Sequence, residues 1–268
     1  MDTWEEAVLW LKNQPDQEEL VKAAYFDDPV SAAAIRYQAS SEWRALRLLL
    51  PRNPGRALDI GAGRGIASYA LAKDGWEVTA LEPDPSHLVG AGAIHHLKEE
   101  TGTSIQVVSE WGESLPFDEG AFDVVFCRQA LHHARDLHTF CREAHRVLRP
   151  GGLFYAIREH VLSHRMDLQK FFELHPLHHR YGGENAYLLG EYLEAIGSAG
   201  LRMKKVLNPL QSDINTFPET RGDIRRRLAK RLHLQEGMIP YVALTWLGAM
   251  SRTPGRLYSF VARKGMHA

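Results

Sequence analysis

Cysteine is almost missing from this chain. Its 268 residues include two, Cys127 and Cys141, which are too few for a disulfide framework. Cys127 also falls within an apolar run that predicts a buried strand. The acidic residues 1–6 lack the basic and apolar regions of a secretory signal. Together these features favour a reducing compartment, and we expect a cytoplasmic protein.

An excess of charge and long apolar runs are lacking as well. The 32 basic and 33 acidic side chains leave a formal net charge of −1, which gives no reason to expect a nucleic-acid partner. No apolar run approaches the roughly 20 residues needed to span a bilayer. We therefore expect no integral membrane segment. The length allows one large domain, or one domain with an appended piece.

Glycine is concentrated in one short stretch that predicts a ligand-binding turn. The apolar run 56–60 contains Asp59 and is followed by glycines at alternate positions, 61, 63 and 65, and then by a helical pattern over 66–73. This order predicts a strand, a tight turn and a helix. Glycines let the backbone approach a ligand closely, and a helix N-terminus presents unpaired N–H groups beside it.

A second apolar run, 78–81, ends on Glu82. A carboxylate at the tip of the second strand can accept hydrogen bonds from both hydroxyls of a ribose. The turn and this acid together predict a cofactor that contains a nucleoside. The spacing G-x-G-x-G differs from the dinucleotide pattern G-x-G-x-x-G, and a nicotinamide cofactor stays as the alternative.

The alternating glycines, preceded by Asp59, resemble motif I of class I S-adenosyl-L-methionine (SAM) methyltransferases. Further segments are similar to the type 11, small-molecule branch of that family and follow in the same order. They resemble its adenine loop, fourth strand, post-strand helix and the turn before the fifth strand: 109–117, 122–127, 131–133 and 146–152. The resemblance covers roughly residues 58–201.

The resemblance implies SAM as the cofactor and assigns it residues at the ends of successive strands: Asp59, Gly61, Ala62, Gly63, Glu82, Pro83, Trp111, Gly112, Glu113 and Arg128. Trp111 stands where the family most often has an acid. We expect it to stack near the adenine, with Gly112 N–H and either Glu110 or Glu113 at the adenine edge. Arg128 and the next residue stand where the family holds the amino-acid part of SAM.

Strands and helices alternate from residue 56 to 154, which predicts a parallel sheet covered by helices on both faces. The fold class that the resemblance implies is α/β: a Rossmann-like sheet of seven strands, mostly parallel, with an antiparallel last strand at 256–264. We expect a helical cap over residues 1–54 and a SAM-binding domain over 55–268. Ligands in such sheets bind beyond the C-terminal strand ends.

Histidine is the outlier of the composition: the chain has fourteen, several of them between His160 and His179. We expect an inserted lid at about 159–187, hereafter the lid segment. If the acceptor is a hydroxyl or a protonated amine, a general base is needed. The candidates for catalysis are His160 and Glu159, at the end of the fifth strand, and His178 and His179 of the lid segment.

A metal site is a weaker alternative, and we predict none because methyl transfer needs no metal. On a helix that begins at Pro176, His175 and His179 would share one face, as pairs of metal ligands do. Glu159, His160 or Glu184 would then supply further ligands. We expect His132 and His133 to be structural.

The tail, about 219–253, reads as helical: 221–233 is basic and 241–250 is apolar. The preferred interpretation is a pair of helices that completes the lid. The alternative is an amphipathic surface that makes peripheral contact with a membrane. The oligomeric state stays open.

We expect an enzyme that moves a methyl group from SAM to an oxygen or nitrogen of a small-molecule acceptor, of glycan or secondary-metabolite type. The sulfonium provides the leaving group, so the protein mainly aligns the acceptor. Two alternatives stay open. One is an enzyme of the same fold that uses SAM for other chemistry, by transfer of another SAM-derived group or by cyclisation. The other is a SAM-binding protein without turnover.

Overall fold

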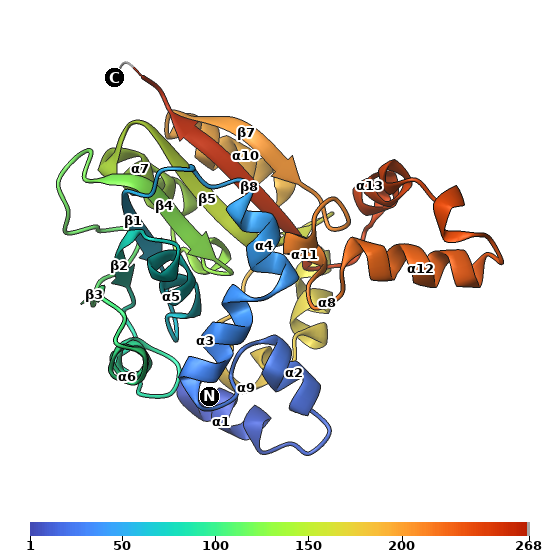
Figure 1. Ribbon diagram of the computed structural model, residues 1–268, viewed down its shortest axis with the longest axis horizontal. Helices are drawn as coiled ribbons and strands as arrows, with labels where there is room; N and C mark the ends of the chain where they lie inside the picture. The colour runs from blue at the N-terminus through green and yellow to red at the C-terminus, as the bar shows by residue number, and fades with distance from the viewer. Residues whose placement is uncertain (267–268) are drawn as a thin grey trace.

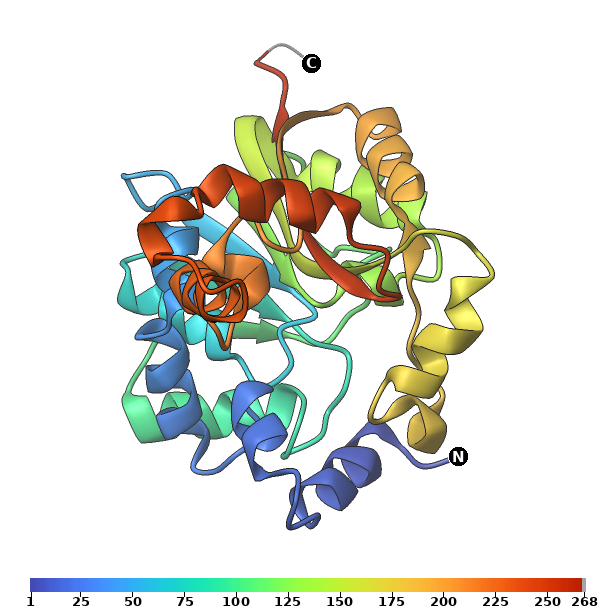
Figure 2. The same ribbon diagram turned by 90° about the vertical axis from the view of Figure 1, so that its right-hand side faces the viewer.

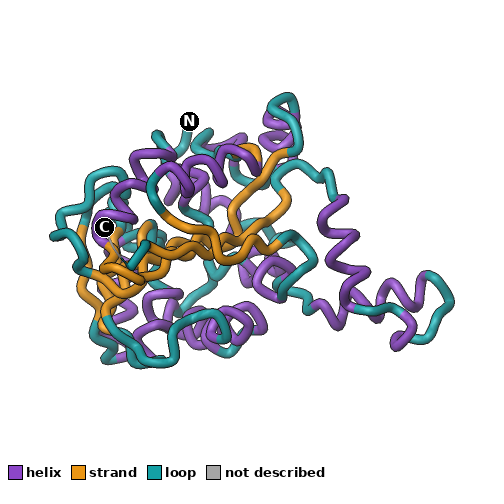
Figure 3. Tube along the Cα trace, turned by 90° about the horizontal axis from the view of Figure 1, so that it is seen from above, coloured by secondary structure: helices purple, strands orange, loops and turns teal. Residues whose placement is uncertain are grey.

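The computed structural model describes residues 1–266 and arranges them around one sheet with helices on both faces (Figure 1, Figure 3). Within this described range, seven strands follow the order β3-β2-β1-β4-β5-β8-β7. Their bounds are β1 (Arg56–Ile60), β2 (Glu77–Leu81), β3 (Ile105–Val108), β4 (Phe122–Arg128), β5 (Leu148–Leu162), β7 (Leu201–Leu207) and β8 (Arg256–Lys264).

The strand directions confirm the predicted fold class. Strands β1 to β5 pair in parallel, and β8 lies antiparallel between β5 and β7. A two-residue strand, β6 (Tyr187–Leu188), adds a short parallel pairing to the end of β5.

Helices and short 3-10 turns fill the connections between the strands. Their bounds are α1 (Trp4–Lys12), α2 (Glu18–Ala23), α3 (Val30–Gln38), α4 (Ser41–Arg47), α5 (Ile66–Lys73), α6 (Ala91–Thr101), η1 (Leu131–His133), α7 (Leu137–Val147), α8 (Asp167–Leu174), α9 (His178–Tyr181), α10 (Leu189–Ser198), α11 (Asp213–Thr216), α12 (Arg221–Arg231), η2 (Glu236–Met238) and α13 (Tyr241–Met250). None of the helices in the described range is both long and apolar enough to cross a membrane.

Two apolar clusters lie on opposite faces of the sheet. Neighbouring residues of β1 divide between them: Ala57 packs with α3, α4 and α5, whereas Leu58 packs with α7 and α10. Successive strand side chains point to opposite faces. Because both faces are covered, the strands carry continuous apolar runs rather than an alternating pattern.

The start of the chain packs against the lid segment. The rings of Trp4 in α1 and Tyr181 in α9 have centroids 4.6 Å apart, and the amide of Asp2 donates to the carbonyl of Arg180 at 3.1 Å. Leu177 belongs to the same apolar cluster as α1 and α2. The N-terminal helices and the lid segment therefore form one continuous cover at the end of the molecule that carries the N-terminus in Figure 1.

One expectation about the lid segment is wrong. Pro176 does not begin a helix, because α8 ends at Leu174 with His175 as an extended C-cap, and α9 begins only at His178. His175 and His179 therefore belong to different segments and do not share a helix face.

The tail forms an arm made of α12, η2 and α13, which extends away from the sheet (Figure 1). Its root packs on the turn after β7: Arg221 Nε donates to the carbonyl of Leu210 at 3.0 Å, and Asn208 Nδ2 donates to that of Thr245 at 3.0 Å. Figure 2 shows α12 on the other side of the view from α8 and α9. The helix pair was correctly predicted, but its contacts give no support to a role in completing the lid.

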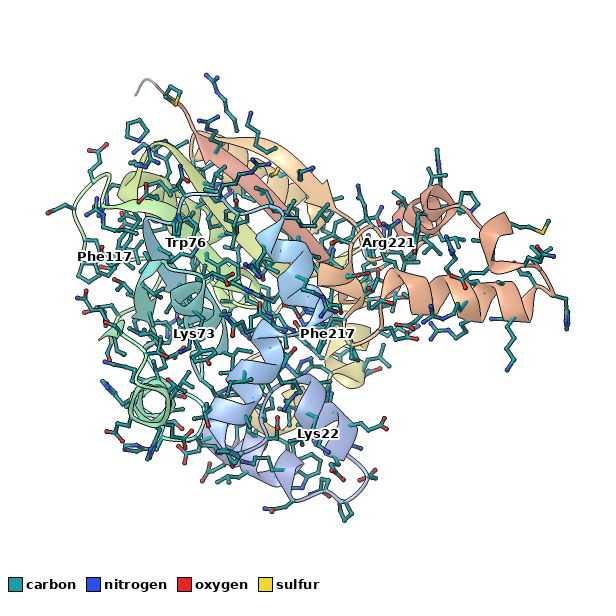
Figure 4. The ribbon with its side chains drawn as sticks, viewed as in Figure 1. Lys22, Lys73, Trp76, Phe117, Phe217 and Arg221 are labelled. Carbon is teal, nitrogen blue, oxygen red and sulfur yellow. The ribbon has the colours of Figure 1, made fainter. Side chains whose placement is uncertain are left out.

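A buried ion pair joins the N-terminal helices to the centre of the sheet. Glu42 of α4 is fully buried and accepts from Arg128 of β4 through Nε at 2.6 Å and Nη2 at 3.0 Å. Arg158 of β5 lies 3.7 Å from the same carboxylate. Burial would raise the pKa of Glu42, but the two guanidinium groups lower it. Phe217, labelled in Figure 4, stacks on Tyr25 beside this group at 5.6 Å.

Replacing Glu42 by Gln should strongly destabilise the protein. The substitution leaves two buried guanidinium groups without a counter-charge, and breaking a buried ion pair costs about 3–5 kcal/mol. Urea unfolding followed by circular dichroism measures the free energy of unfolding. Glu18→Gln is the matched control, because it removes an exposed pair with Lys22, and we expect no measurable change. An equal effect of the two substitutions would contradict the structural role of Glu42.

Candidate cofactor and acceptor site

The glycine turn between β1 and α5 is held against the end of β2. The amides of Gly61 and Ala62 donate to the carbonyl of Leu81 at 2.9 and 3.1 Å. All three glycines of the turn have positive φ angles, between 54° and 78°, which glycine adopts without strain. A Cβ at Gly61 would lie 2.7 Å from the Cβ of Ala130, in the segment after β4. The turn and that segment therefore pack directly against each other.

Glu82 lies beside this turn and is buried. Its Oε2 accepts from the amide of Gly63 at 2.7 Å, and its Oε1 accepts from that of Asp84 at 2.9 Å. Burial raises the pKa of Glu82, against the smaller effect of these two amides. A carboxylate has about four acceptor positions, so both oxygens can accept further hydrogen bonds. Pro83, between Glu82 and Asp84, has no N–H that could occupy these acceptor positions.

Asp59 lies inside β1 and is buried. Its carboxylate accepts from Ser68 Oγ of α5 at 2.6 Å. Burial raises the pKa of Asp59 to about 7, although the bond from Ser68 acts in the opposite direction. The acid thus ties the strand to the helix beneath the glycine turn, which is the geometry expected of a group that organises this loop.

The predicted adenine loop meets the segment after η1. Glu113 Oε1 accepts from the amide of Arg135 at 2.7 Å. Trp111 is 54% exposed, and its ring centroid lies 4.8 Å from the guanidinium carbon of Arg135. Gly112 is buried, and a Cβ there would approach the ring of Phe140 to 2.4 Å. The tryptophan is thus open to solvent on the loop, and the glycine fits against α7.

Arg128 was predicted to lie near the amino-acid part of SAM. Its guanidinium is bound by Glu42 and also donates to Gln129 Oε1 at 2.9 Å. Gln129 has a φ of 51°, so the backbone turns sharply where β4 ends. A contact from this segment to the cofactor would therefore come from its backbone, and it stays a prediction.

Beyond the end of β4, beside the last residues of β5, lies a second polar group, which we call the histidine cluster. Its carboxylates and imidazoles are joined by contacts of 2.7 to 3.9 Å, and the rings of His132 and His160 have centroids 4.8 Å apart. Its members are His132, His133, Glu159, His160, His175 and Glu184.

Glu159 is fully buried, and its two oxygens are both engaged. Oε2 accepts from Nδ1 of His132 at 2.7 Å and from the amide of the same residue at 3.0 Å, while Oε1 accepts from the amide of Ala130 at 3.3 Å. Burial would lower the pKa of His132, but Glu159 and Glu184 outweigh it and raise the pKa to about 9. Glu159 therefore positions His132.

A bulge in β5 produces this arrangement. The register with β8 shifts between Ala156 and Glu159, and Arg158 has a φ of 61°. A bulge bends the strand and redirects its side chains. Arg158 accordingly points toward Glu42 and α11, whereas Glu159 points toward His132. The strand was predicted to end here, but it continues to Leu162.

His160 presents a nitrogen lone pair to the cluster. Its Nδ1 lies 2.8 Å from the carbonyl of Gly255. Because a carbonyl can only accept, Nδ1 carries the proton and Nε2 keeps its lone pair. Burial and the charge of His132 lower the pKa of His160 to about 3, so its ring is neutral.

Glu184 reaches the cluster from the loop that follows α9. Its Oε1 accepts from the hydroxyl of Tyr181 and lies 3.5 Å from Nε2 of His175. Its Oε2 is 3.6 Å from Nε2 of His132 and is buried without a hydrogen-bond partner among the described residues. Burial would raise the pKa of Glu184, but the surrounding histidines hold it well below the usual range.

The four residues predicted for catalysis are thus divided. His160 and Glu159 lie within the cluster. His178 instead stacks on Phe172 with centroids 3.9 Å apart, and the exposed His179 packs edge-on against Trp10 at 5.5 Å. The cluster also contains His132, which we had expected to be structural. The sequence did contain a signal for this cluster. It was the pair of histidines shortly after the fourth strand, together with an acid at the end of the fifth.

The part of the chain that carries the glycine turn and Glu82 matches a known family. Residues 58–156 match the family model described as a methyltransferase domain. Over these residues the chain is similar to a methyltransferase domain. This confirms the resemblance to class I SAM-dependent methyltransferases. The match ends before Glu159, so most of the histidine cluster lies outside the region that defines the methyltransferase domain.

Similar proteins agree with this assignment. A ubiquinone biosynthesis O-methyltransferase from Methylobacterium sp. (strain 4-46) is 37% identical over 99 residues, which are 37% of this chain and 39% of that relative. The chain therefore matches about two fifths of that relative's length.

Two solved structures share the fold around the methyltransferase domain. A geranyl diphosphate methyltransferase in complex with GPP and sinefungin has a TM-score of 0.61 and 18% identity over 97% of this chain and 98% of its own. The cyclase SpnF has a TM-score of 0.56 and 19% identity over 88% of this chain and 81% of its own. At such identities the likeness supports the fold alone.

Proposed function

We propose that this protein transfers a methyl group from SAM to an oxygen or nitrogen atom of a small-molecule acceptor. One observation carries the proposal: the glycine turn touches the segment that leads into the histidine cluster. A Cβ at Gly61 would lie 2.7 Å from Ala130, and the amide of Ala130 donates to Glu159 at 3.3 Å. A cofactor on the turn and an acceptor beside the cluster would be neighbours.

The cofactor assignment draws on the methyltransferase domain and on the geometry of Glu82. The carboxylate of Glu82 faces the glycine turn and has unused acceptor positions, which the binding of ribose hydroxyls requires. A solved relative of this fold, geranyl diphosphate methyltransferase, is described in complex with SAM. The exposed Trp111 provides an aromatic face for the adenine.

The acceptor side supports chemistry at a group that must lose a proton. The sulfonium of SAM needs no activation, so alignment is the main task of the protein. A hydroxyl acceptor must also lose its proton, and His160 Nε2 and Glu184 Oε2 are unprotonated atoms of the cluster that could accept a hydrogen bond from it. The relative from Methylobacterium is named as an O-methyltransferase, which favours oxygen as the acceptor atom.

Product analysis by mass spectrometry tests the proposed reaction. Incubation with SAM and a panel of hydroxylated and aminated small molecules should yield S-adenosylhomocysteine and a product heavier by one methyl group. The fold is shared with a cyclase, so a rearranged product without added mass would instead favour other chemistry. Absence of turnover across the panel, with SAM bound, would favour a binding protein.

Substituting Glu82 by Ala should weaken the binding of SAM and S-adenosylhomocysteine tenfold to a hundredfold. A hydrogen bond to a charged group contributes about 1.5–3 kcal/mol, and about 1.4 kcal/mol corresponds to tenfold. Calorimetry measures both affinities, and circular dichroism verifies folding. Glu77→Ala, an exposed acid at the start of the same strand, is the matched control. Unchanged affinity in folded Glu82→Ala protein would contradict the cofactor site.

We propose further that the arm makes peripheral contact with an anionic membrane. Its α13 exposes large apolar side chains: Val242 is 58%, Trp246 67% and Met250 64% exposed. Its α12 carries a series of basic residues: Arg221, Arg225, Arg226, Arg227, Lys230 and Arg231. Arg221, labelled in Figure 4, lies at the root of the arm. Arg225, Arg226 and Arg227 pair with nearby acids, and the remaining basic residues together with the apolar side chains of α13 suit the headgroup region of a bilayer.

Sedimentation with anionic vesicles tests this contact. The protein should sediment at low salt and be released at high salt, because ions screen the attraction to the surface. Trp246→Ala should reduce binding by removing an exposed apolar anchor. Leu48→Ala, another exposed apolar residue outside the arm, is the matched control and should bind like the wild type. No sedimentation at low salt would rule out the membrane contact.

A further inference from the structure

Three side chains of the histidine cluster converge from different elements: His132 from η1, His160 from β5 and Glu184 from the loop after α9. One ligand atom of each lies within 4.8 Å of those of the other two. Two imidazoles and one carboxylate bind Zn²⁺ and similar divalent ions in catalytic sites that keep a further position open. We infer that these three residues form a site for a divalent transition-metal ion such as Zn²⁺.

Both histidines are oriented as metal ligands are. Nδ1 of His132 is 2.7 Å from Glu159, and Nδ1 of His160 is 2.8 Å from the carbonyl of Gly255. Metal-binding histidines usually donate their other ring N–H to a carboxylate or a backbone carbonyl, which fixes the ring and the tautomer. In this arrangement Nε2 of each ring is the ligand atom, and Nε2 of His132 already lies 3.6 Å from Glu184 Oε2.

Glu184 supplies an independent observation. Its side chain is 4% exposed, and Oε2 has no hydrogen-bond partner among the described residues although it is buried. Leaving a buried acceptor without a hydrogen bond is unfavourable, and more so when it is charged. The other oxygen accepts from the hydroxyl of Tyr181 and lies near His175, so the carboxylate is oriented with Oε2 toward the histidines. A cation bound there would satisfy it.

The charges of the cluster favour a divalent ion. Glu159 and Glu184 are both buried, and they carry two negative charges when the imidazoles are neutral, as ligation requires. Buried charges are tolerated when they are paired or coordinate a metal. Tyr181 and His175 contribute neutral groups around Glu184. A divalent ion would therefore balance the charge of the two carboxylates.

Binding requires a small contraction of the site. Two ligands at about 2.1 Å from one ion can lie at most about 4.2 Å apart, which is less than the observed limit of 4.8 Å. Glu184 follows Gly182 and Gly183, and Gly182 has a φ of 69°. Glycine allows backbone conformations closed to other residues, so this loop can move the carboxylate toward His132 and His160.

The role of the ion rests on the proposed function. An acceptor hydroxyl in the open position would lose its proton to water near neutral pH, because a bound ion lowers the pKa of an oxygen ligand. The resulting oxyanion would attack the methyl carbon of SAM. A carbon–oxygen bond forms, the carbon–sulfur bond breaks, and the sulfur keeps the electron pair as S-adenosylhomocysteine leaves.

The test is direct titration of the chelator-treated full-length protein with zinc chloride by calorimetry. We expect one ion per chain, with binding abolished by Glu184→Gln or His160→Ala. Glu159→Gln should retain the stoichiometry but lose about 10–100-fold in affinity, as substitutions of outer-shell partners do. His164→Ala removes an exposed histidine of the same lid segment and should bind like the wild type.

Cobalt titration gives a second readout that does not depend on the stability of the variants. Co²⁺ bound to the wild-type site should give the intense visible absorption that is typical of four-coordinate cobalt. Added zinc should displace the cobalt and abolish this absorption. Failure of the wild-type protein to bind one ion, or equal losses in His164→Ala and Glu184→Gln, would overturn the site. Zinc binding without any methylated product would leave the site standing and overturn the proposed function. Full turnover in the metal-free enzyme would overturn the role of the ion.

Discussion

The carboxylate of Glu42 holds the C-terminal strand ends in their places. It is buried between Arg128 of β4 and Arg158 of β5, at 2.6 and 3.7 Å. Arg158 in turn donates to the carbonyl of Ile214 in α11 at 2.7 Å. One acid on an N-terminal helix therefore fixes two central strands and a helix of the later chain relative to one another. Because a charge out of water must be matched by partners of fixed geometry, these ends cannot shift independently.

The same edge of the sheet gathers further buried acids, and each is held in a different way. Asp59 accepts from a serine hydroxyl, Glu82 from two amides, and Glu159 from an imidazole and two amides. Glu184 Oε2 is buried without a hydrogen bond among the described residues and lies 3.6 Å from Nε2 of His132. Desolvation makes a buried carboxylate costly unless its oxygens are bound, so the hydrogen-bonded acids build a rigid frame and Glu184 Oε2 marks the place where a ligand is expected.

The sequence predicted the fold, and it placed the glycine turn beside Glu82, because these signals are local; cofactor binding at this turn stays a prediction. The glycine spacing, Asp59 and Glu82 lie within one strand–helix–strand unit, and the structure has them as expected. The histidine cluster depends on contacts between distant segments: Glu159 meets His132 across 27 residues, and Glu42 meets Arg128 across 86. The bulge at Arg158 contains no glycine, which would have indicated it in the sequence. The orientation of Glu159 toward His132 could therefore not be predicted from the local sequence. The same lack of tertiary information led to a helix being predicted at Pro176.

The position of β8 has a consequence for how the chain is made. This strand follows β7 in the sequence but lies between β5 and β7 in the sheet. While the ribosome is still producing the arm, β5 and β7 have no strand to join them, and the open edge of β5 offers its backbone groups to other chains. Such edges invite aggregation. The chain is therefore most exposed to such pairing before β8 has been made.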